Sequence, residues 1–222
     1  MALKGGTGIR KVFLGDYRFS DDLDFTLVHE HDRNDLEERI IKAVKAAKGK
    51  SGINFEEDIT LKEVDNGYAI SVYFRILRTT GSPLRIKLDL TRKDREVKLL
   101  SYEKRMLIHP FSDVVETSVL SYSFEEVFAE KIRALFERTR SRDLYDVWRL
   151  SKLGLDVSSI IYDKFCFKGV TFNLETLVDR KEDFDGSWEA SLRHQLNVLP
   201  DFDDVFEVVG KYLKKIYMNF KA

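Results

Sequence analysis

The stretch LKGGTGIRKVFLGDYRFSDDLDFTL, residues 3–27, holds the features from which the fold and a candidate site can be predicted. Gly5 and Gly6 follow a very short apolar segment, which predicts a brief strand, a tight turn and a helix over residues 7–14. Residues 22–28 alternate between apolar and polar side chains, which predicts a strand. The segment therefore places a glycine turn and a carboxylate-bearing strand close together in the chain.

Asp22 and Asp24 are expected on one face of that strand, because successive strand side chains point to opposite faces. Leu23, Phe25 and Leu27 then point the other way and should pack into the core. Two neighbouring carboxylates repel each other unless a positive charge lies between them. Mg²⁺ is the natural candidate, because it prefers a few carboxylates together with water and substrate phosphates.

Asp89 is the third carboxylate selected by the same reasoning. In LRIKLDL, residues 84–90, every second side chain is apolar, so Arg85, Lys87 and Asp89 share the polar face. If this strand pairs beside the first, three carboxylates converge, and such a set can hold two metal ions about 3.5–4 Å apart for phosphoryl transfer. The simpler alternative is that alternating acids form only the solvated face of a strand.

Gly5, Gly6 and Thr7 are candidates for binding phosphate. Glycine allows the backbone to approach a ligand closely, and the N-terminus of a helix attracts anions. A glycine pair alone is weak support, because tight turns use glycine constantly. Followed by a strand with two aspartates, it indicates a nucleotide site.

The remaining pattern separates a mixed α/β half from a helical half near residue 120, which predicts domains at 1–120 and 121–222. A capping pair, Ser123 and Glu126, marks the first helix of the second half. The expected helices cover residues 34–48, 124–138, 142–153 and 203–219. The expected strands cover 53–64, 68–76 and 84–90, with turns at Asn66-Gly67 and Gly81-Ser82-Pro83.

The composition is that of a globular protein, with 43% hydrophobic and 34% charged residues in 222. The formal net charge of −1 creates no global attraction to nucleic acid or membranes, so an anionic partner needs a local basic patch. The lone cysteine, Cys166, lies between two phenylalanines, is expected to be buried and excludes an internal disulfide. Without a secretory signal or a membrane-spanning apolar run, the sequence predicts a cytoplasmic protein.

Five segments occur in the order found in AbiEii/AbiGii-type nucleotidyltransferases: LKGGTGIR, RFSDDLDF, KLDL, AEKIRAL and SRDLYDVW. The chain resembles that family, which belongs to the DNA polymerase beta-like nucleotidyltransferase superfamily and includes toxins of type IV toxin–antitoxin and abortive-infection systems. The resemblance covers residues 3 to about 150. It implies an α+β fold, with a polymerase beta-like mixed sheet and flanking helices, followed by a C-terminal helical lobe.

The resemblance also implies roles for individual residues. Asp22, Asp24 and Asp89 would bind the catalytic Mg²⁺ ions, and Asp89 could also act as the base. The segment Gly5–Thr7 would hold the nucleotide triphosphate, and Lys131 and Asp143 match an essential lysine and aspartate of the family. The chain departs from the pattern at Gly8, where alanine is common, and in having only four residues before Gly5. That short start suggests a truncated or minimal member.

Lys131 also stands out without the resemblance, because it falls on the apolar stripe of its expected helix with Val127, Phe128 and Leu135. Such a lysine either extends its ammonium to the surface or faces an anion, and a triphosphate would explain its position.

Asp143 is harder to interpret from spacing alone. It lies three residues from Asp146 on one helix face, where acids near the helix N-terminus or an Arg142–Asp146 surface pair give a structural alternative.

Together these features predict a Mg²⁺-dependent nucleotidyltransferase that moves NMP from an NTP to an acceptor, the 3′ end of tRNA by resemblance. The expected partners are NTP, RNA and an antitoxin encoded nearby, with no membrane. A local basic surface for RNA is expected from Lys42, Lys45, Arg138, Arg140 and Arg142. The alternatives are transfer to a small molecule or a protein, and a catalytically silent nucleotide-binding module.

Overall fold

The computed structural model describes residues 1–76, 81–109 and 116–221, and its contacts divide the chain into two compact units. The first unit contains Met1–Gly15, Ser20–Glu96 and Lys104–Ser121; the second contains Asp16–Phe19, Val97–Glu103 and Tyr122–Ala222. The chain passes from the first unit to the second for the last time after Ser121. Two short segments from the first 120 residues nevertheless belong to the second unit, which the predicted division did not anticipate.

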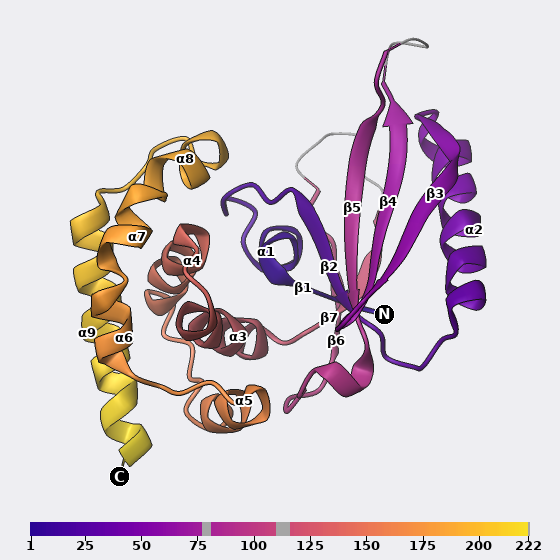
Figure 1. Cartoon of the computed structure of the whole chain (residues 1–222). Coiled ribbons are helices and arrows are strands. Elements are labelled where there is room, and N and C mark those ends of the chain that lie inside the picture. Colours follow the sequence, from indigo (N-terminus) through magenta and orange to yellow (C-terminus); the bar gives the residue numbers. More distant parts are fainter. Residues whose placement is uncertain (77–80, 110–115, 222) are drawn as a thin grey trace. The chain divides into compact units, whose positions relative to one another are not determined.

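The first unit is built on a seven-stranded mixed sheet in the order β3-β4-β5-β2-β1-β7-β6 (Figure 1). β2 runs parallel to β5 and β1 runs parallel to β7, whereas β1–β2, β3–β4 and β4–β5 are antiparallel. Its strands are β1 (Ala2–Lys4), β2 (Asp22–Thr26), β3 (Asn54–Val64), β4 (Gly67–Arg75), β5 (Leu84–Thr91), β6 (Glu103–Met106) and β7 (Ser118–Ser121). The predicted mixed sheet with flanking helices is confirmed.

Helix α2 (Arg33–Ser51) covers one face of the β3–β4–β5 part of this sheet (Figure 1). Asp32 caps its N-terminus by accepting a hydrogen bond from the Asp35 amide, and Gly52 ends it in the left-handed conformation. The core beneath it gathers apolar side chains from the helix and from alternate strand positions: Leu27, Leu36, Ile40, Phe55, Leu61, Tyr68, Ile70, Val72 and Leu90. Because strand side chains alternate, the opposite face of β2 and β5 carries their polar residues.

The hairpin between β3 and β4 turns at Asp65-Asn66, one residue before the predicted Asn66-Gly67, and Gly67 is the first residue of β4, where only glycine fits. Gly67 has φ +154°, and a Cβ there would lie 1.9 Å from the carbonyl oxygen of Leu90 on the neighbouring strand. Glycine thus lets β4 approach β5 closely at its first residue, where Gly67 pairs with Thr91. This contact helps to set the register that carries Asp89.

The second unit is helical. Helix α3 (Phe124–Glu137) begins at Ser123, whose hydroxyl accepts a hydrogen bond from the Glu126 amide. The predicted helices at 142–153 and 203–219 correspond to α4 (Ser141–Ser151) and α9 (Phe202–Lys221). Between them lie helices that the sequence analysis did not predict: α5 (Ile161–Lys168), α6 (Leu174–Asp179), α7 (Lys181–Gly186) and α8 (Trp188–Leu192), with the short 3₁₀ turn η3 (Arg193–Gln195).

Cys166 is exposed, so the prediction that it is buried was wrong: α5 turns Phe165 into the core, whereas its next residue faces outward. Across the residues that the structure describes, no helix combines the length and apolar character needed to span a bilayer.

Segment 97–103 is held in the helical unit by a buried charge cluster. The Lys164 ammonium lies 2.5 Å from Glu126 and donates to the Val97 carbonyl at 2.6 Å. Glu126 in turn accepts hydrogen bonds from the amides of Leu99 and Leu100. These buried contacts explain why a segment from the N-terminal half belongs to the second unit.

Candidate functional site

The three predicted aspartates lie on one face of two adjacent parallel strands. In the β2–β5 register, Asp24 is the partner of Asp89 and Asp22 is the partner of Lys87. Partners in a sheet point to the same side, so Asp22, Asp24 and Asp89 share the face opposite the α2 core. All three are half-buried. The structure therefore brings together residues that are 67 positions apart, since 89 − 22 = 67.

Lys87 supplies the positive charge among these carboxylates. Its ammonium lies 2.5 Å from Oδ2 of Asp89. The hydrogen bond to Asp89 raises the pKa of Lys87, and the negative charges of Asp89, Asp22 and Asp24 act in the same direction against partial burial. The ammonium thus occupies the kind of position that a divalent cation would take.

The donor set fits a divalent cation, although the side chains are not gathered around one. Among the described residues, no group of three His, Cys, Asp or Glu side chains is arranged to hold a metal ion. Three carboxylates on neighbouring strand positions are the oxygen ligands that Mg²⁺ prefers, and a cation would have to replace the ammonium of Lys87.

Gly5 packs directly against Asp24. Its φ is +68°, and a Cβ added to it would lie 2.2 Å from Oδ2 of Asp24, so only glycine fits. The predicted helix at 7–14 is instead a four-residue helix, α1 (Gly5–Gly8), continued by the π-helical turn η1 (Ile9–Phe13). Thr7 is buried and its hydroxyl donates to the Asp22 carbonyl at 2.5 Å. The glycine turn and the aspartate strand are therefore a single packed element.

Lys131 and Asp143 lie in the helical unit, in a buried network of charges. The Lys131 ammonium is 3.1 Å from Asp143 and 2.7 Å from Asp146. Arg138 also donates to Asp143, at 2.8 Å. Of the two alternatives predicted for Lys131, its ammonium faces an anion, and that anion is supplied within the protein by two carboxylates of α4.

Asp146 is the centre of this network. Burial acts to raise its pKa, but Arg18 and Lys131 overcome that effect, so the pKa of Asp146 is held well below its ordinary value. The pKa of Asp143 is also lowered, because Lys131 and Arg138 outweigh burial. Burial acts to lower the pKa of Lys131, and the two carboxylates raise it instead. All three groups therefore stay charged near neutral pH.

Arg18 is the member of this network that the sequence analysis missed. It donates to both carboxylate oxygens of Asp146, at 2.6 and 2.8 Å, and to the side chain of Gln195 at 2.9 Å. Tyr17 donates to Asp146 at 2.5 Å. The suggested Arg142–Asp146 surface pair was wrong, because the Asp146 side chain is fully buried and is bound by these partners. Arg18 lies close to the aspartate strand in the sequence, but its partner Asp146 lies 128 residues away, so local spacing could not identify the pair.

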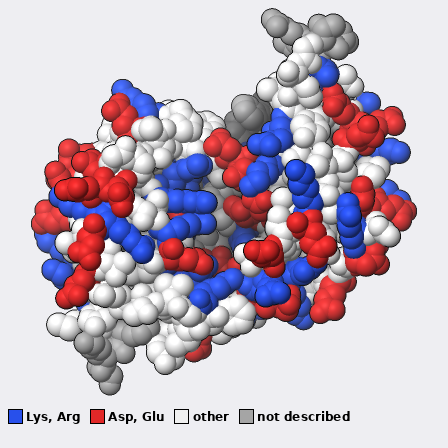
Figure 2. Space-filling view, in the orientation of Figure 1, with Lys and Arg blue, Asp and Glu red and all other residues white. Residues whose placement is uncertain are grey.

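The residues expected to form a basic surface are spread over both units. Lys42 and Lys45 are exposed on α2, which packs against the sheet face opposite the aspartates, and Lys42 pairs with Glu38. Arg138 pairs with Asp143, and Arg140 is exposed. Figure 2 shows acidic and basic side chains interspersed over the visible face of each unit. No predicted lysine of α2 therefore lies on the aspartate face.

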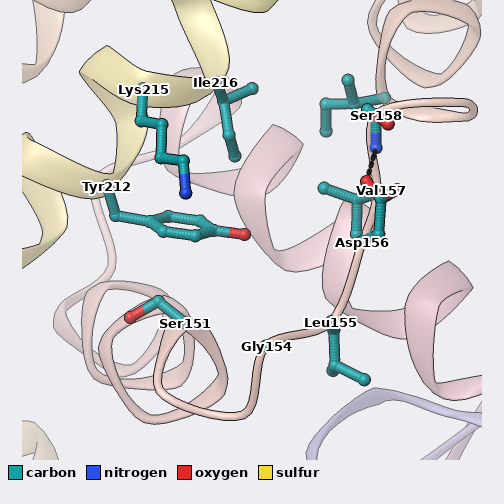
Figure 3. A pocket seen from close by; sticks show the side chains of 10 residues that line it. Ser151, Gly154, Leu155, Asp156, Val157, Ser158, Tyr212, Lys215 and Ile216 are labelled. Atoms are coloured by element: carbon teal, nitrogen blue, oxygen red, sulfur yellow. Dashed lines mark hydrogen bonds between the residues drawn. The ribbon is translucent and has the colours of Figure 1, made fainter.

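The helical unit also has a pocket of about 370 Å³ at the end of α4 (Figure 3). Tyr212 and Lys215 of α9 line it opposite the 154–158 segment, where Asp156 accepts a hydrogen bond from the Ser158 amide. Burial and the charge of Asp156 raise the pKa of Tyr212 to about 12. None of its lining residues is a predicted site residue.

Comparison with known proteins gives three findings. A family model described as "Nucleotidyl transferase AbiEii toxin, Type IV TA system" matches residues 1–208. Among solved structures, MenT4, a nucleotidyltransferase toxin from Mycobacterium tuberculosis H37Rv, is similar with a TM-score of 0.62 and 19% identity, covering 97% of this chain and 75% of that chain. An antigenic nucleotidyltransferase-like protein from Paracoccidioides brasiliensis matches with a TM-score of 0.40 and 13% identity, covering 89% and 85%.

Comparison with curated protein sequences gives no significant match. The similarity to MenT4 shows the fold, and the family match covers the glycine turn, the three strand aspartates, Lys131 and Asp143.

Proposed function

We propose that this chain, which belongs to the AbiEii family of nucleotidyltransferase toxins of type IV toxin–antitoxin systems, transfers NMP from an NTP to the 3′-terminal hydroxyl of tRNA. The family makes the protein a nucleotidyltransferase and implies an NTP substrate and an antitoxin partner. The identity of the acceptor and the use of Mg²⁺ are the parts that we propose.

The observation that carries the proposal is the shared face of Asp22, Asp24 and Asp89, with Gly5 packed against Asp24. Carboxylates collected on adjacent strands repel each other, and a bound divalent cation would offset that repulsion and attract the phosphates of a nucleotide. Lys87, held by Asp89, offsets the repulsion in the absence of a ligand.

Asp22, Asp24 and Asp89 would hold Mg²⁺. When bound, the ions would stabilise the charge on the reacting phosphate and lower the pKa of the acceptor hydroxyl. Mg²⁺ fits better than a softer metal because all three side-chain ligands are carboxylates.

The protein's own contribution is to position the reactants. Because no Cβ projects from Gly5, the backbone of the glycine turn lies directly against the Asp24 carboxylate, and a triphosphate held by Gly5–Thr7 would lie next to that aspartate. Asp89 accepts the proton of the acceptor hydroxyl. The hydroxyl oxygen then forms a bond to the α-phosphorus, the bond from that phosphorus to the bridging oxygen breaks, and pyrophosphate leaves with the electron pair. Positioning supplies much of the rate.

Lys131 and Asp143 are proposed to be essential as well. In the structure each already has a partner, so their part in nucleotide binding requires Lys131 to exchange a carboxylate for a phosphate oxygen. The buried carboxylates keep Lys131 protonated, which such a role needs.

The test is incubation of the protein with each of four α-³²P-labelled NTPs, Mg²⁺ and deproteinised tRNA. We expect label at the RNA 3′ end, and its loss on removal of divalent ions with EDTA. Asp22→Ala and Asp89→Ala should abolish transfer, whereas Asp65→Ala, in the exposed turn after β3, should not. Transfer that persists in Asp89→Ala would overturn the assignment.

Parallel incubations with a total-protein fraction and a metabolite extract identify the acceptor class. Label appearing only in one of those fractions would refute RNA as the acceptor while leaving the nucleotidyltransferase activity intact.

A further inference from the structure

We infer that the polar face of strands β3, β4 and β5, defined by Lys62, Tyr73 and Arg85, binds the single-stranded end of the RNA acceptor. This inference rests on the proposed function, because it assumes that the acceptor hydroxyl reacts at Asp89. It concerns only the first unit, in which all of these residues lie.

The register of the sheet places these side chains on the aspartate face. One row across the strands contains Lys62, Ala69, Asp89 and Asp24, and the next contains Thr60, Ser71, Lys87 and Asp22. One step further along, Tyr73 is the direct partner of Arg85. Residues in register share a face, so Lys62, Tyr73 and Arg85 point to the same side as the carboxylates.

The chemistry of the three side chains suits a single strand of RNA. Lys62 and Arg85 are exposed, and within the part of the chain that the structure describes neither forms an ion pair, so both charges are available to phosphates. Tyr73 is half-buried beside the Arg85 backbone, which gives a base an aromatic face and a guanidinium against which to stack. The small side chain of Ala69 lies between Lys62 and Asp89, and Lys87 lies between Arg85 and Asp89 on the same face.

The spacing favours an oligonucleotide over a small acceptor. Lys62 is two strands from Asp89, about 10 Å away, and Arg85 is four residues along β5, about 13 Å away. A molecule that reacts at Asp89 and also contacts both cations must be extended and must carry several negative charges. Linked nucleotides meet both requirements, whereas a single small metabolite does not.

The glycine turn lies on the other side of the carboxylates. In the strand order β5-β2-β1, Gly5 follows β1, whereas β4 and β3 lie beyond β5. The triphosphate and the acceptor can therefore approach Asp24 and Asp89 from opposite sides within the first unit, as an in-line displacement requires.

The experiment measures fluorescence anisotropy of the full chain with a 5′-fluorescein, 12-nucleotide single-stranded RNA, without NTP or metal. Tyr73→Ala should weaken binding roughly tenfold, because base stacking on an aromatic side chain is lost. Tyr73→Phe, which retains the ring, should bind as the wild type does. Arg85→Gln and Lys62→Gln should each weaken binding several-fold and reduce the slope of log K against log salt by roughly 0.7. Lys45→Gln, on α2 across the sheet, is the matched control and should change neither quantity.

Wild-type affinity in Tyr73→Ala and Arg85→Gln would overturn the inference, as would equal weakening in Lys45→Gln or a preference for a duplex of the same sequence. The substituted side chains are exposed or half-buried, and circular dichroism verifies that the variants are folded. Binding is measured without transfer, so the two proposals can fail separately. RNA that binds this face but is never labelled refutes the proposed acceptor, and RNA that is labelled equally by all variants refutes the binding face.

Discussion

Arg18 and Asp146 form a bidentate ion pair inside the helical unit, with guanidinium nitrogens 2.6 and 2.8 Å from the two carboxylate oxygens. Their side chains are 3% and 0% exposed. The pair joins the segment Asp16–Phe19 to α4, so a piece of chain that immediately precedes the aspartate strand is fixed within the second unit. Removing one partner of a buried ion pair strongly destabilises a protein, because the remaining charge is left in a poorly solvated site.

Arg18→Met should lower the free energy of unfolding by about 3–5 kcal/mol, because Asp146 would lose both hydrogen bonds from the guanidinium. Urea denaturation followed by circular dichroism measures the loss. The control is Arg149→Met, which removes a pair with the exposed Asp16 and should cost about 0–1 kcal/mol. Similar losses of unfolding free energy in the two variants would show that the buried Arg18 pair stabilises the protein no more than an exposed pair does.

Stability should fall on acidification because of the same network. The folded-state pKa values of Asp146 and Asp143 lie below the ordinary value of 3.8. Their contribution is therefore fully present above about pH 5 and is lost as pH falls through the lower, folded-state values. Urea midpoints measured from pH 6 down to pH 2.5 should decrease in the wild type. Asp146→Asn should be less stable at pH 6 and should lose less on acidification; an equal acid loss would assign the effect to other groups.

Much of the first unit follows from local patterns. The alternation in residues 84–90 placed Asp89 on the polar face of its strand, and the alternation after Asp22 did the same for Asp24. The carboxylates then come together because β2 and β5 are neighbours in the sheet. Helix α2 was predicted from its periodic apolar face, and helix α3 from the capping pair of Ser123 and Glu126. These patterns involve residues only a few positions apart, so they predict secondary structure without knowledge of the tertiary structure.

The features that were not predicted depend on distant residues or on very short elements. Helices α5–α8 have five to eight residues each, too few to show a helical period. Arg18 finds Asp146 128 residues away, and nothing local marks the pair. For Lys131 the sequence left open whether its ammonium reaches the surface or faces an anion; the anion is supplied by two carboxylates of α4, which only the fold could identify.

Gly5→Ala should impair transfer far more than Gly8→Ala. A Cβ at position 5 would collide with Asp24, and a left-handed alanine costs roughly 1–2 kcal/mol, so Asp24 must shift. At position 8 the nearest atom to an added Cβ lies at 3.6 Å, an ordinary contact. Rates of NMP transfer, compared at a temperature where both variants are folded, test this. Equal rates would mean that the turn does not need to be a glycine for catalysis.

Lys131→Met tests whether this lysine does more than neutralise Asp143 and Asp146. Loss of its charge should destabilise the protein, and if it binds nucleotide it should also reduce transfer by at least tenfold per folded molecule. Lys164→Met is the matched control, because Lys164 is a buried lysine paired with Glu126 and Glu130. We expect the control to lose stability but to keep its rate. A wild-type rate in Lys131→Met would leave that residue with a structural role alone.

Lys87 and Asp89 should act in opposite directions on metal affinity. The ammonium of Lys87 lies against Asp89 and offsets the charge of the neighbouring carboxylates, so a divalent cation must displace it. Removing this competitor by Lys87→Gln should tighten Mn²⁺ binding several-fold in isothermal titration calorimetry, whereas Asp89→Asn should weaken it by at least tenfold because a ligand is lost. Lys93→Gln, at an exposed lysine just beyond β5, should leave the affinity unchanged. Weaker Mn²⁺ binding in Lys87→Gln would show that the lysine supports the metal site instead of competing with the ion, and unchanged binding in Asp89→Asn would remove that aspartate from the ligand set.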